Sequence, residues 1–207
     1  MRPISRPEHW AGEWPAVVVA AAGRDERRTL LRALAARMLD LSPNEVSISH
    51  GEGRAPRLTR PAGTRLYLSC AGRAGLAAMA VGRAPIGVDV EAVEPEAEPA
   101  WNVLHAEEQA FLCRLAPGER GGAFARLWAC KEAYLKALGT GLAREPSSFA
   151  VLPGPDGSVC VRDAHAPAAG IALSAAWVAF EGRDFAVALA ELGAASRRTG
   201  SRDAGMP

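Results

Sequence analysis

The chain has 207 residues, 49% hydrophobic and 23% charged, and its 24 basic and 23 acidic residues leave a formal net charge of +1. This composition is typical of an ordinary soluble globular protein, and the balance of charge argues against a broad surface for nucleic acid or anionic lipid. The longest apolar run, residues 14–22, is far shorter than the roughly 20 residues that span a bilayer, and the first residues lack the apolar region of a secretory signal, so we expect a cytoplasmic protein.

The first part of the chain is predicted to contain one helix among several strands. Residues 14–22 are rich in Val and end at a glycine, which indicates a buried strand. Residues 25–41 carry an apolar stripe at helical spacing and are predicted to form a helix. Further strands are expected over residues 45–49, 65–69, 76–81 and 85–91, with a loop over residues 51–63. An acidic, Pro-rich linker over residues 91–99 is the best internal boundary.

The second part repeats this order of helix followed by strands. Helices are expected over residues 106–115 and 121–138, and strands over residues 147–152, 158–162, 171–178 and 185–189. The repeated order predicts an α+β fold of two similar halves packed side by side, each a helix on a small antiparallel sheet. We place the N-terminal half at residues 1–92, the C-terminal half at residues 93–192, and a disordered tail at residues 193–207.

Two carboxylates stand out in the strand over residues 85–91. Asp89 and Glu91 alternate with apolar residues, so both project from one face of the strand, about 7 Å apart. Gly87, on the same face, is expected to leave open space beside them. Two carboxylates on a rigid strand suit Mg²⁺, which typically takes one or two together with substrate phosphates. The alternative is a solvated strand face that runs into the acidic linker.

The only two lysines of the chain, Lys131 and Lys136, lie on the helix over residues 121–138. Lys131 falls within the apolar stripe of that helix, where an ammonium group needs an anion or an escape to solvent. Glu132 and Lys136 are four apart and share a face, which an ordinary surface pair would also explain. If Glu132 lay beside Asp89 and Glu91, three acidic groups would be available for a metal and Lys136 for a phosphate.

The four cysteines are widely separated and include no C-x-x-C pair. A zinc site and a disulfide framework are therefore not expected, and we predict free, mostly packed thiols.

The segment Ile86-Gly-Val-Asp-Val-Glu91, followed after some forty residues by Leu127-Trp-Ala-Cys-Lys-Glu-Ala-Tyr-Leu-Lys136, resembles the signature of Sfp-type 4′-phosphopantetheinyl transferases. Members of that family use Mg²⁺ to move phosphopantetheine from coenzyme A onto a serine of an acyl or peptidyl carrier protein. Their fold is a pseudo-dimer of two α+β halves with the active site in the cleft between them. The resemblance thus implies a monomeric holo-[acyl-carrier-protein] synthase serving fatty acid, polyketide or non-ribosomal peptide biosynthesis.

The resemblance also assigns roles to individual residues. It implies that Asp89, Glu91 and Glu132 hold Mg²⁺, that Glu132 is the base for the carrier serine, and that Lys136 contacts the phosphates. Residues implied to bind coenzyme A are Arg28 and Thr29 on the first helix, Arg54 in a Gly-Arg-Ala-Pro loop, and Ser69 and Cys70. A carrier is expected to contact the apolar surface near Phe111 and Leu112.

One position departs from the family pattern. The family has a histidine for the 3′-phosphate of coenzyme A where this chain has Cys70, and a neutral thiol is a poor anion ligand. His50 lies 39 residues before Asp89, against 19 for Cys70, so we interpret it as a loop residue ahead of Arg54. This departure supports an alternative function, a catalytically weak homologue that binds coenzyme A or a carrier. An unrelated Mg²⁺-dependent phosphotransferase is a more distant alternative, because the chain has no glycine-rich phosphate loop of the Walker or kinase type.

Overall fold

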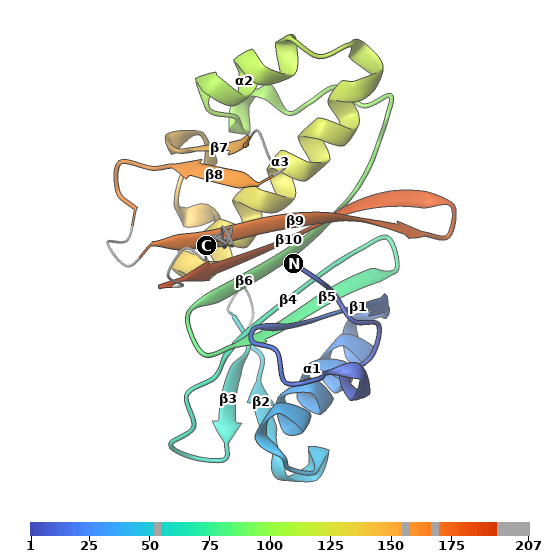
Figure 1. Cartoon of the computed structure of the whole chain (residues 1–207), viewed down its shortest axis with the longest axis vertical. Coiled ribbons are helices and arrows are strands. Elements are labelled where there is room, and N and C mark those ends of the chain that lie inside the picture. The colour runs from blue at the N-terminus through green and yellow to red at the C-terminus, as the bar shows by residue number, and fades with distance from the viewer. Residues whose placement is uncertain (52–54, 155–157, 167–169, 194–207) are drawn as a thin grey trace, which may run out of the picture.

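The computed structural model describes residues 1–51, 55–154, 158–166 and 170–193. In this part of the chain, two antiparallel sheets are stacked face to face, and each is covered on its outer face by a helix (Figure 1). The order of layers is therefore helix, sheet, sheet, helix.

The first sheet and its helix come from the first 82 residues. Its strand order is β1-β5-β4-β3-β2, and all of its pairings are antiparallel. The elements are β1 (Ala16–Ala21), α1 (Arg24–Leu39), β2 (Ser47–Ser49), β3 (Arg57–Arg60), β4 (Tyr67–Arg73) and β5 (Leu76–Gly82). Leu31 and Leu34 of α1 pack onto Val18 and Met79 of the sheet, as the apolar stripe of the helix predicts.

The second sheet has three strands in the order β6-β10-β9, with β6 (Ile86–Ala92), β9 (Ile171–Phe180) and β10 (Arg183–Leu192). The helix α3 (Pro117–Leu138) covers its outer face, where β10 presents Ala186, Ala188 and Ala190. The helix α2 (Ala106–Cys113) and a hairpin of β7 (Ala150–Pro153) and β8 (Val159–Arg162) complete this half.

The two sheets share one apolar layer between them. Val17 and Ala78 of the first sheet lie in the same buried cluster as Val88, Val90 and Val187 of the second. Because β6 alternates strictly, its valines enter this layer while Asp89 and Glu91 face α3. The carboxylates therefore lie on the face of the sheet that a helix covers.

The α+β class and the antiparallel sheets confirm the sequence-based expectation, with differences in detail. The predicted loop over residues 51–63 contains β3, and α3 begins at Pro117, four residues before the predicted start, because proline fits the first turn of a helix. By its pairing with β10, β6 belongs to the second sheet. Most of the predicted tail, residues 194–207, lies outside the described residues.

Among the described helices, none combines the length and the apolar character needed to cross a membrane. The four cysteines are free, as predicted, but only Cys130 is fully buried, while Cys113 and Cys160 are exposed.

Candidate functional site

Asp89 of β6 is a buried carboxylate at the centre of the candidate site. It is 5% exposed, and its Oδ1 lies 2.6 Å from Nζ of Lys136 on α3. Its second oxygen, Oδ2, is buried and has no hydrogen-bond partner. Burial raises the pKa of Asp89 to about 7, against the opposing effect of the Lys136 ammonium group. A buried carboxylate oxygen without a donor is a place where a cation would be favourable.

Glu91 lies two residues further along β6, at the half-buried edge of the same face. Its Oε2 is 3.3 Å from Nε of Arg73 on β4, so an ion pair joins the two sheets here. Burial raises the pKa of Glu91, while Arg73 and a hydrogen bond with the Trp128 side chain lower it. The sequence analysis did not assign a role at the site to Arg73 or Trp128. Arg73 could have been found from the sequence, because it is four residues from Ser69 on β4 and therefore lies on the same face of the strand.

Glu132 is half-buried on α3 and completes the predicted acidic set. Its negative charge raises the pKa of both Asp89 and Glu91, so the three carboxylates lie within electrostatic reach of one another. In the described part of the chain, however, no three His, Cys, Asp or Glu side chains are gathered closely enough to hold a metal ion. The structure brings the predicted groups into one region, with Lys136 paired to Asp89.

Gly87 corrects one expectation. A β-carbon added there would lie 1.9 Å from the carbonyl oxygen of Ala133 and 2.6 Å from the backbone nitrogen of Ala137. The space beside the carboxylates is therefore filled by the backbone of α3 rather than open. Only a residue without a side chain lets α3 approach β6 this closely, and this contact places Lys136 against Asp89.

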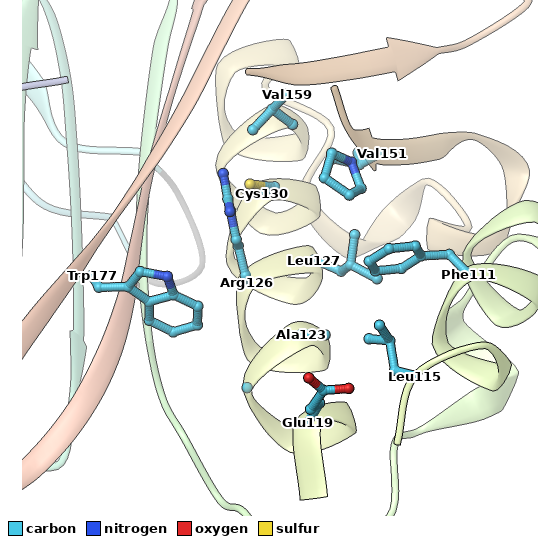
Figure 2. Close-up of a pocket in the computed structure, with 12 residues that line it drawn as sticks. Phe111, Leu115, Glu119, Ala123, Arg126, Leu127, Cys130, Val151, Val159 and Trp177 are labelled. Atoms are coloured by element: carbon cyan, nitrogen blue, oxygen red, sulfur yellow. The ribbon is translucent and has the colours of Figure 1, made fainter. Parts of the chain in front are cut away.

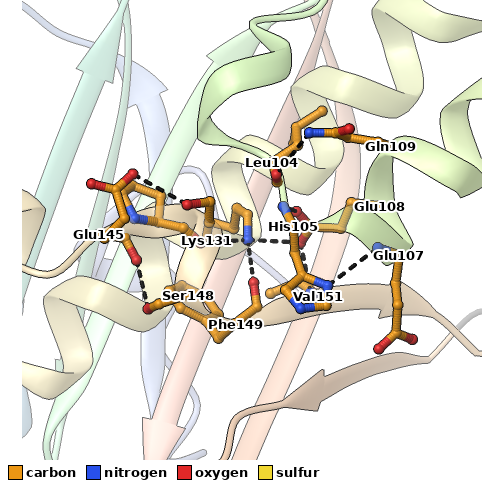
Figure 3. Close-up of polar contacts among 12 residues, drawn as sticks. Leu104, His105, Glu107, Glu108, Gln109, Lys131, Glu145, Ser148, Phe149 and Val151 are labelled. Atoms are coloured by element: carbon orange, nitrogen blue, oxygen red, sulfur yellow. Dashed lines mark hydrogen bonds and ion pairs between the residues drawn. The ribbon is translucent and has the colours of Figure 1, made fainter.

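Lys131 pairs with a carboxylate, as its position in the apolar stripe of the helix required. That carboxylate is Glu108, which is not one of the three predicted metal ligands. The lysine Nζ lies 2.8 Å from Oε1 of Glu108 on α2, and both side chains are fully buried (Figure 3). It also donates hydrogen bonds to the carbonyl oxygens of Pro146 (2.9 Å) and Phe149 (2.7 Å). Glu108 in turn accepts from the backbone nitrogens of His105 and Val151. Lys131 is therefore part of a structural network.

The predicted coenzyme A residues lie on the other half. Arg28 and Thr29 of α1 line a cavity that His50 also lines, although the sequence interpretation had set His50 aside as a loop residue. It does lie in a loop, directly after β2. Arg54 lies outside the described residues.

Ser69 and Cys70 are neighbours on β4 and point to opposite faces of the sheet. Ser69 is buried, and its Oγ accepts a hydrogen bond of 3.0 Å from the backbone nitrogen of Val88, which ties β4 to β6 next to Asp89. Cys70 packs on the α1 side. Burial raises the pKa of the Cys70 thiol, against the positive charges of Arg27, Lys136 and Arg28.

An apolar cavity of about 290 Å³ lies on a different face of α3 (Figure 2). Phe111, Leu127, Cys130 and Trp177 are among its lining residues. Cys130 and Glu132 are two residues apart on a helix and so point in nearly opposite directions, which separates this cavity from the acidic set. Leu112 is fully buried, so the predicted carrier contact near Phe111 and Leu112 cannot include its side chain.

Comparison with known proteins adds evidence for this region. Residues 85–190, which contain β6 and α3, match the family described as the 4′-phosphopantetheinyl transferase superfamily. A 4′-phosphopantetheinyl transferase from Bacillus subtilis is 30% identical over 141 residues, which are 67% of this chain and 62% of that protein. The transferase Sfp of Bacillus subtilis (strain 168) is 29% identical over 151 residues, which are 69% of this chain and 66% of that protein.

The chain thus matches somewhat less than two thirds of the length of these relatives. Among solved structures, a holo-(acyl-carrier-protein) synthase from Bacillus anthracis in complex with CoA (3′,5′-ADP) is similar with a TM-score of 0.43 and 23% identity. That match covers 53% of this chain and 95% of the other.

Proposed function

Because the chain belongs to the 4′-phosphopantetheinyl transferase superfamily, we propose that it transfers 4′-phosphopantetheine from coenzyme A to a serine of an acyl or peptidyl carrier protein. The observation that carries the proposal is the buried, unpartnered Oδ2 of Asp89 beside Lys136. It lies inside the matched segment, within electrostatic reach of Glu91 and Glu132.

Although the described carboxylates are not gathered closely enough to hold an ion as they stand, the chemistry of their oxygens suits Mg²⁺. Asp89 offers a free carboxylate oxygen, and Glu91 and Glu132 add hard oxygen ligands of the kind that Mg²⁺ prefers. Bound there, Mg²⁺ would neutralise charge on the pyrophosphate of coenzyme A.

Glu132 and Lys136 have further roles in the proposed transfer, one in moving a proton and the other in stabilising charge. Glu132 accepts the proton of the carrier serine as its oxygen attacks the phosphorus that bears the pantetheine. The bond from that phosphorus to the bridging oxygen breaks, and adenosine 3′,5′-bisphosphate leaves. Lys136 stabilises the negative charge that develops on the leaving phosphate, and the balanced products are the phosphopantetheinylated carrier and the nucleotide.

One observation favours the alternative, a homologue that binds coenzyme A or a carrier without efficient transfer. Lys136 already neutralises Oδ1 of Asp89 at 2.6 Å, and the described carboxylates are not gathered around one point. A cation and the lysine would have to share Asp89.

Mass spectrometry of apo carrier proteins separates the two functions. Fatty acid, polyketide and non-ribosomal peptide carriers are each incubated with the enzyme, coenzyme A and Mg²⁺, and at least one should gain the mass of phosphopantetheine. Asp89→Asn should remove most of this transfer, whereas Asp184→Asn, an exposed matched control on β10, should retain it. Binding of coenzyme A without modification of any carrier would favour the alternative, and full activity of Asp89→Asn would overturn the role of the acidic set.

A further inference from the structure

The strand β9 is an open edge of the second sheet, whose strand order is β6-β10-β9. The two-residue turn that joins β9 to β10 has positive φ at Glu181 and Gly182, so the residues that flank it form a hydrogen-bonded pair. Such pairs alternate along an antiparallel ladder, so every second residue of β9 turns its N–H and C=O groups away from β10. Towards the turn, these residues are Ala175, Trp177 and Ala179. In the described part of the chain, no other backbone group bonds to them.

The strand β9 lacks the features that protect the other sheet edges. At the outer edge of β1, Ile4 donates a hydrogen bond to Val17 and accepts one from Val19. The edge strand β2 has only three residues, and β6 is tied to β4 by the hydrogen bond of Ser69. By contrast, β9 has ten residues, none of them charged or proline, and pairs with β10 without a bulge. Native edge strands normally carry charges, prolines or bulges that prevent pairing with another chain, so the sequence of β9 favours such pairing.

The part of β9 nearest the turn is accessible and apolar. The hairpin of β7 and β8 lies beside the first part of β9, and the last residues extend past it (Figure 1). Residues 175–180 span about 20 Å, the usual length of a strand in a sheet. The Trp177 side chain is 51% exposed, a high value for a large hydrophobic side chain. It lies at one side of the apolar cavity, across α3 from Phe111 and Leu115 (Figure 2).

A second copy of β9 is the occupant that fits this edge. With a two-fold axis at Trp177, antiparallel pairing sets each outward N–H against a C=O of the other copy, and Ala175 faces Ala179 of the second copy. Because the strand has no charge, the two copies do not repel, and the small alanines leave room for two indole rings on one face. The end of the chain itself, residues 194–207, fits less well, because it contains three arginines and its only large apolar residue is Met206.

We propose that the chain forms a dimer through β9, in which the two three-stranded sheets join into one of six strands and Trp177 of each copy rests against the apolar cavity of the other. This inference does not depend on the proposed function, and it departs from the monomer that the family resemblance implies. The paired edge lies away from the acidic set, because the cavity and Glu132 are on different faces of α3. One strand and one aromatic side chain from each copy make a small interface, so we expect a dissociation constant of the order of 10 µM.

Sedimentation equilibrium at concentrations below and above that constant tests the dimer. The average mass of the wild type should rise from 21.7 kDa to about twice that value. Trp177→Ser should weaken the dimer by about 30-fold or more, as expected for an aromatic residue at the centre of an interface. Ala179→Lys should also weaken it, because a charge then lies on the paired edge. Ala172→Lys, the same change at an exposed position near the other end of β9, is the matched control and should have no effect.

Cysteine cross-linking tests the register of the pairing. A chain that carries both Ala175→Cys and Ala179→Cys should form a disulfide-linked dimer on mild oxidation, because opposed residues of the ladder have Cα atoms about 5.5 Å apart, within the reach of a disulfide. Four residues apart on one strand, the two new thiols cannot bond within a chain. Either single variant should show only the level of cross-linking that the native free cysteines give.

A mass that stays at 21.7 kDa at the highest concentration would overturn the inference. Equal weakening by Ala172→Lys and Ala179→Lys, or no excess of linked dimer in the double cysteine variant, would do the same. A monomeric wild type whose binding to an apo carrier protein is weakened by Trp177→Ser would assign this edge to the carrier instead of a second copy.

Discussion

Lys131 and Lys136 lie five positions apart on α3, yet their ammonium groups have different surroundings. Lys131 is fully buried against Glu108 and two carbonyl oxygens, so every donor has a fixed protein partner. The Lys136 side chain is 30% exposed, and its partner Asp89 retains a free oxygen. Only Lys136 can therefore reach a bound phosphate.

Lys136→Ala should lower the turnover number by roughly two to three orders of magnitude, as expected for loss of one group that stabilises developing charge. Lys136→Arg should recover only part of the loss, because a planar fork does not replace a compact ammonium group. Steady-state kinetics of carrier modification measure both variants. Wild-type turnover in Lys136→Ala would mean that the lysine serves only as the ion-pair partner of Asp89.

At the scale of elements, the site depends on how closely α3 can lie on β6. A side chain at Gly87 would enter the backbone of α3, which cannot move aside as a flexible side chain could. Gly87→Ala should therefore destabilise the fold by about 1 to 3 kcal/mol, the range for overpacking a core, and also impair transfer. Gly122→Ala is the matched control within α3, because its added carbon meets nothing closer than 3.9 Å. That variant should gain about 0.5 to 1 kcal/mol from helix propensity.

Urea unfolding monitored by circular dichroism gives both free energies. If Gly87→Ala proved as stable and as active as the wild type, close approach of α3 would not be what sets the geometry of the site.

The Lys131–Glu108 network joins α2, α3 and the start of β7. Lys131→Met should destabilise the protein by about 3 to 5 kcal/mol, because it leaves a buried carboxylate without its cation. Combining it with Glu108→Gln should restore much of this loss, since the amide carries no charge. Urea unfolding of the two single variants and the double variant gives the three free energies of a double-mutant cycle. Strict additivity would show that the two groups do not interact.

At the scale of the whole molecule, residues of the first sheet contact the strand that carries Asp89 and Glu91. Asp89 belongs to β6, which is hydrogen-bonded to β10 of the second sheet and also to Ser69 of the first. The ion pair of Arg73 with Glu91 crosses the same junction. A half by itself would hold only part of the groups that the proposed reaction requires.

Because one apolar cluster is shared by both sheets, neither half can unfold without exposing buried surface of the other. We expect a single cooperative thermal transition, with equal calorimetric and van't Hoff enthalpies. Differential scanning calorimetry measures this ratio. Two resolved transitions would show that the halves are independent units with a weak interface.

The sequence by itself predicted most of the elements and proposed the residues of the candidate site. Alternation along β6 placed Asp89 and Glu91 on one face, and helical spacing placed Glu132 beside Lys136, because both patterns depend only on local backbone geometry. The apolar stripe also required an anion for Lys131.

Tertiary structure decided which groups meet. It chose Glu108, distant in sequence, as the partner of Lys131, and it filled the space at Gly87 with a helix. It also brought His50 into the cavity that Arg28 and Thr29 line, although sequence distance alone had set that residue aside. Such contacts depend on how sheets and helices stack, and local periodicity carries no information about the partner across a layer.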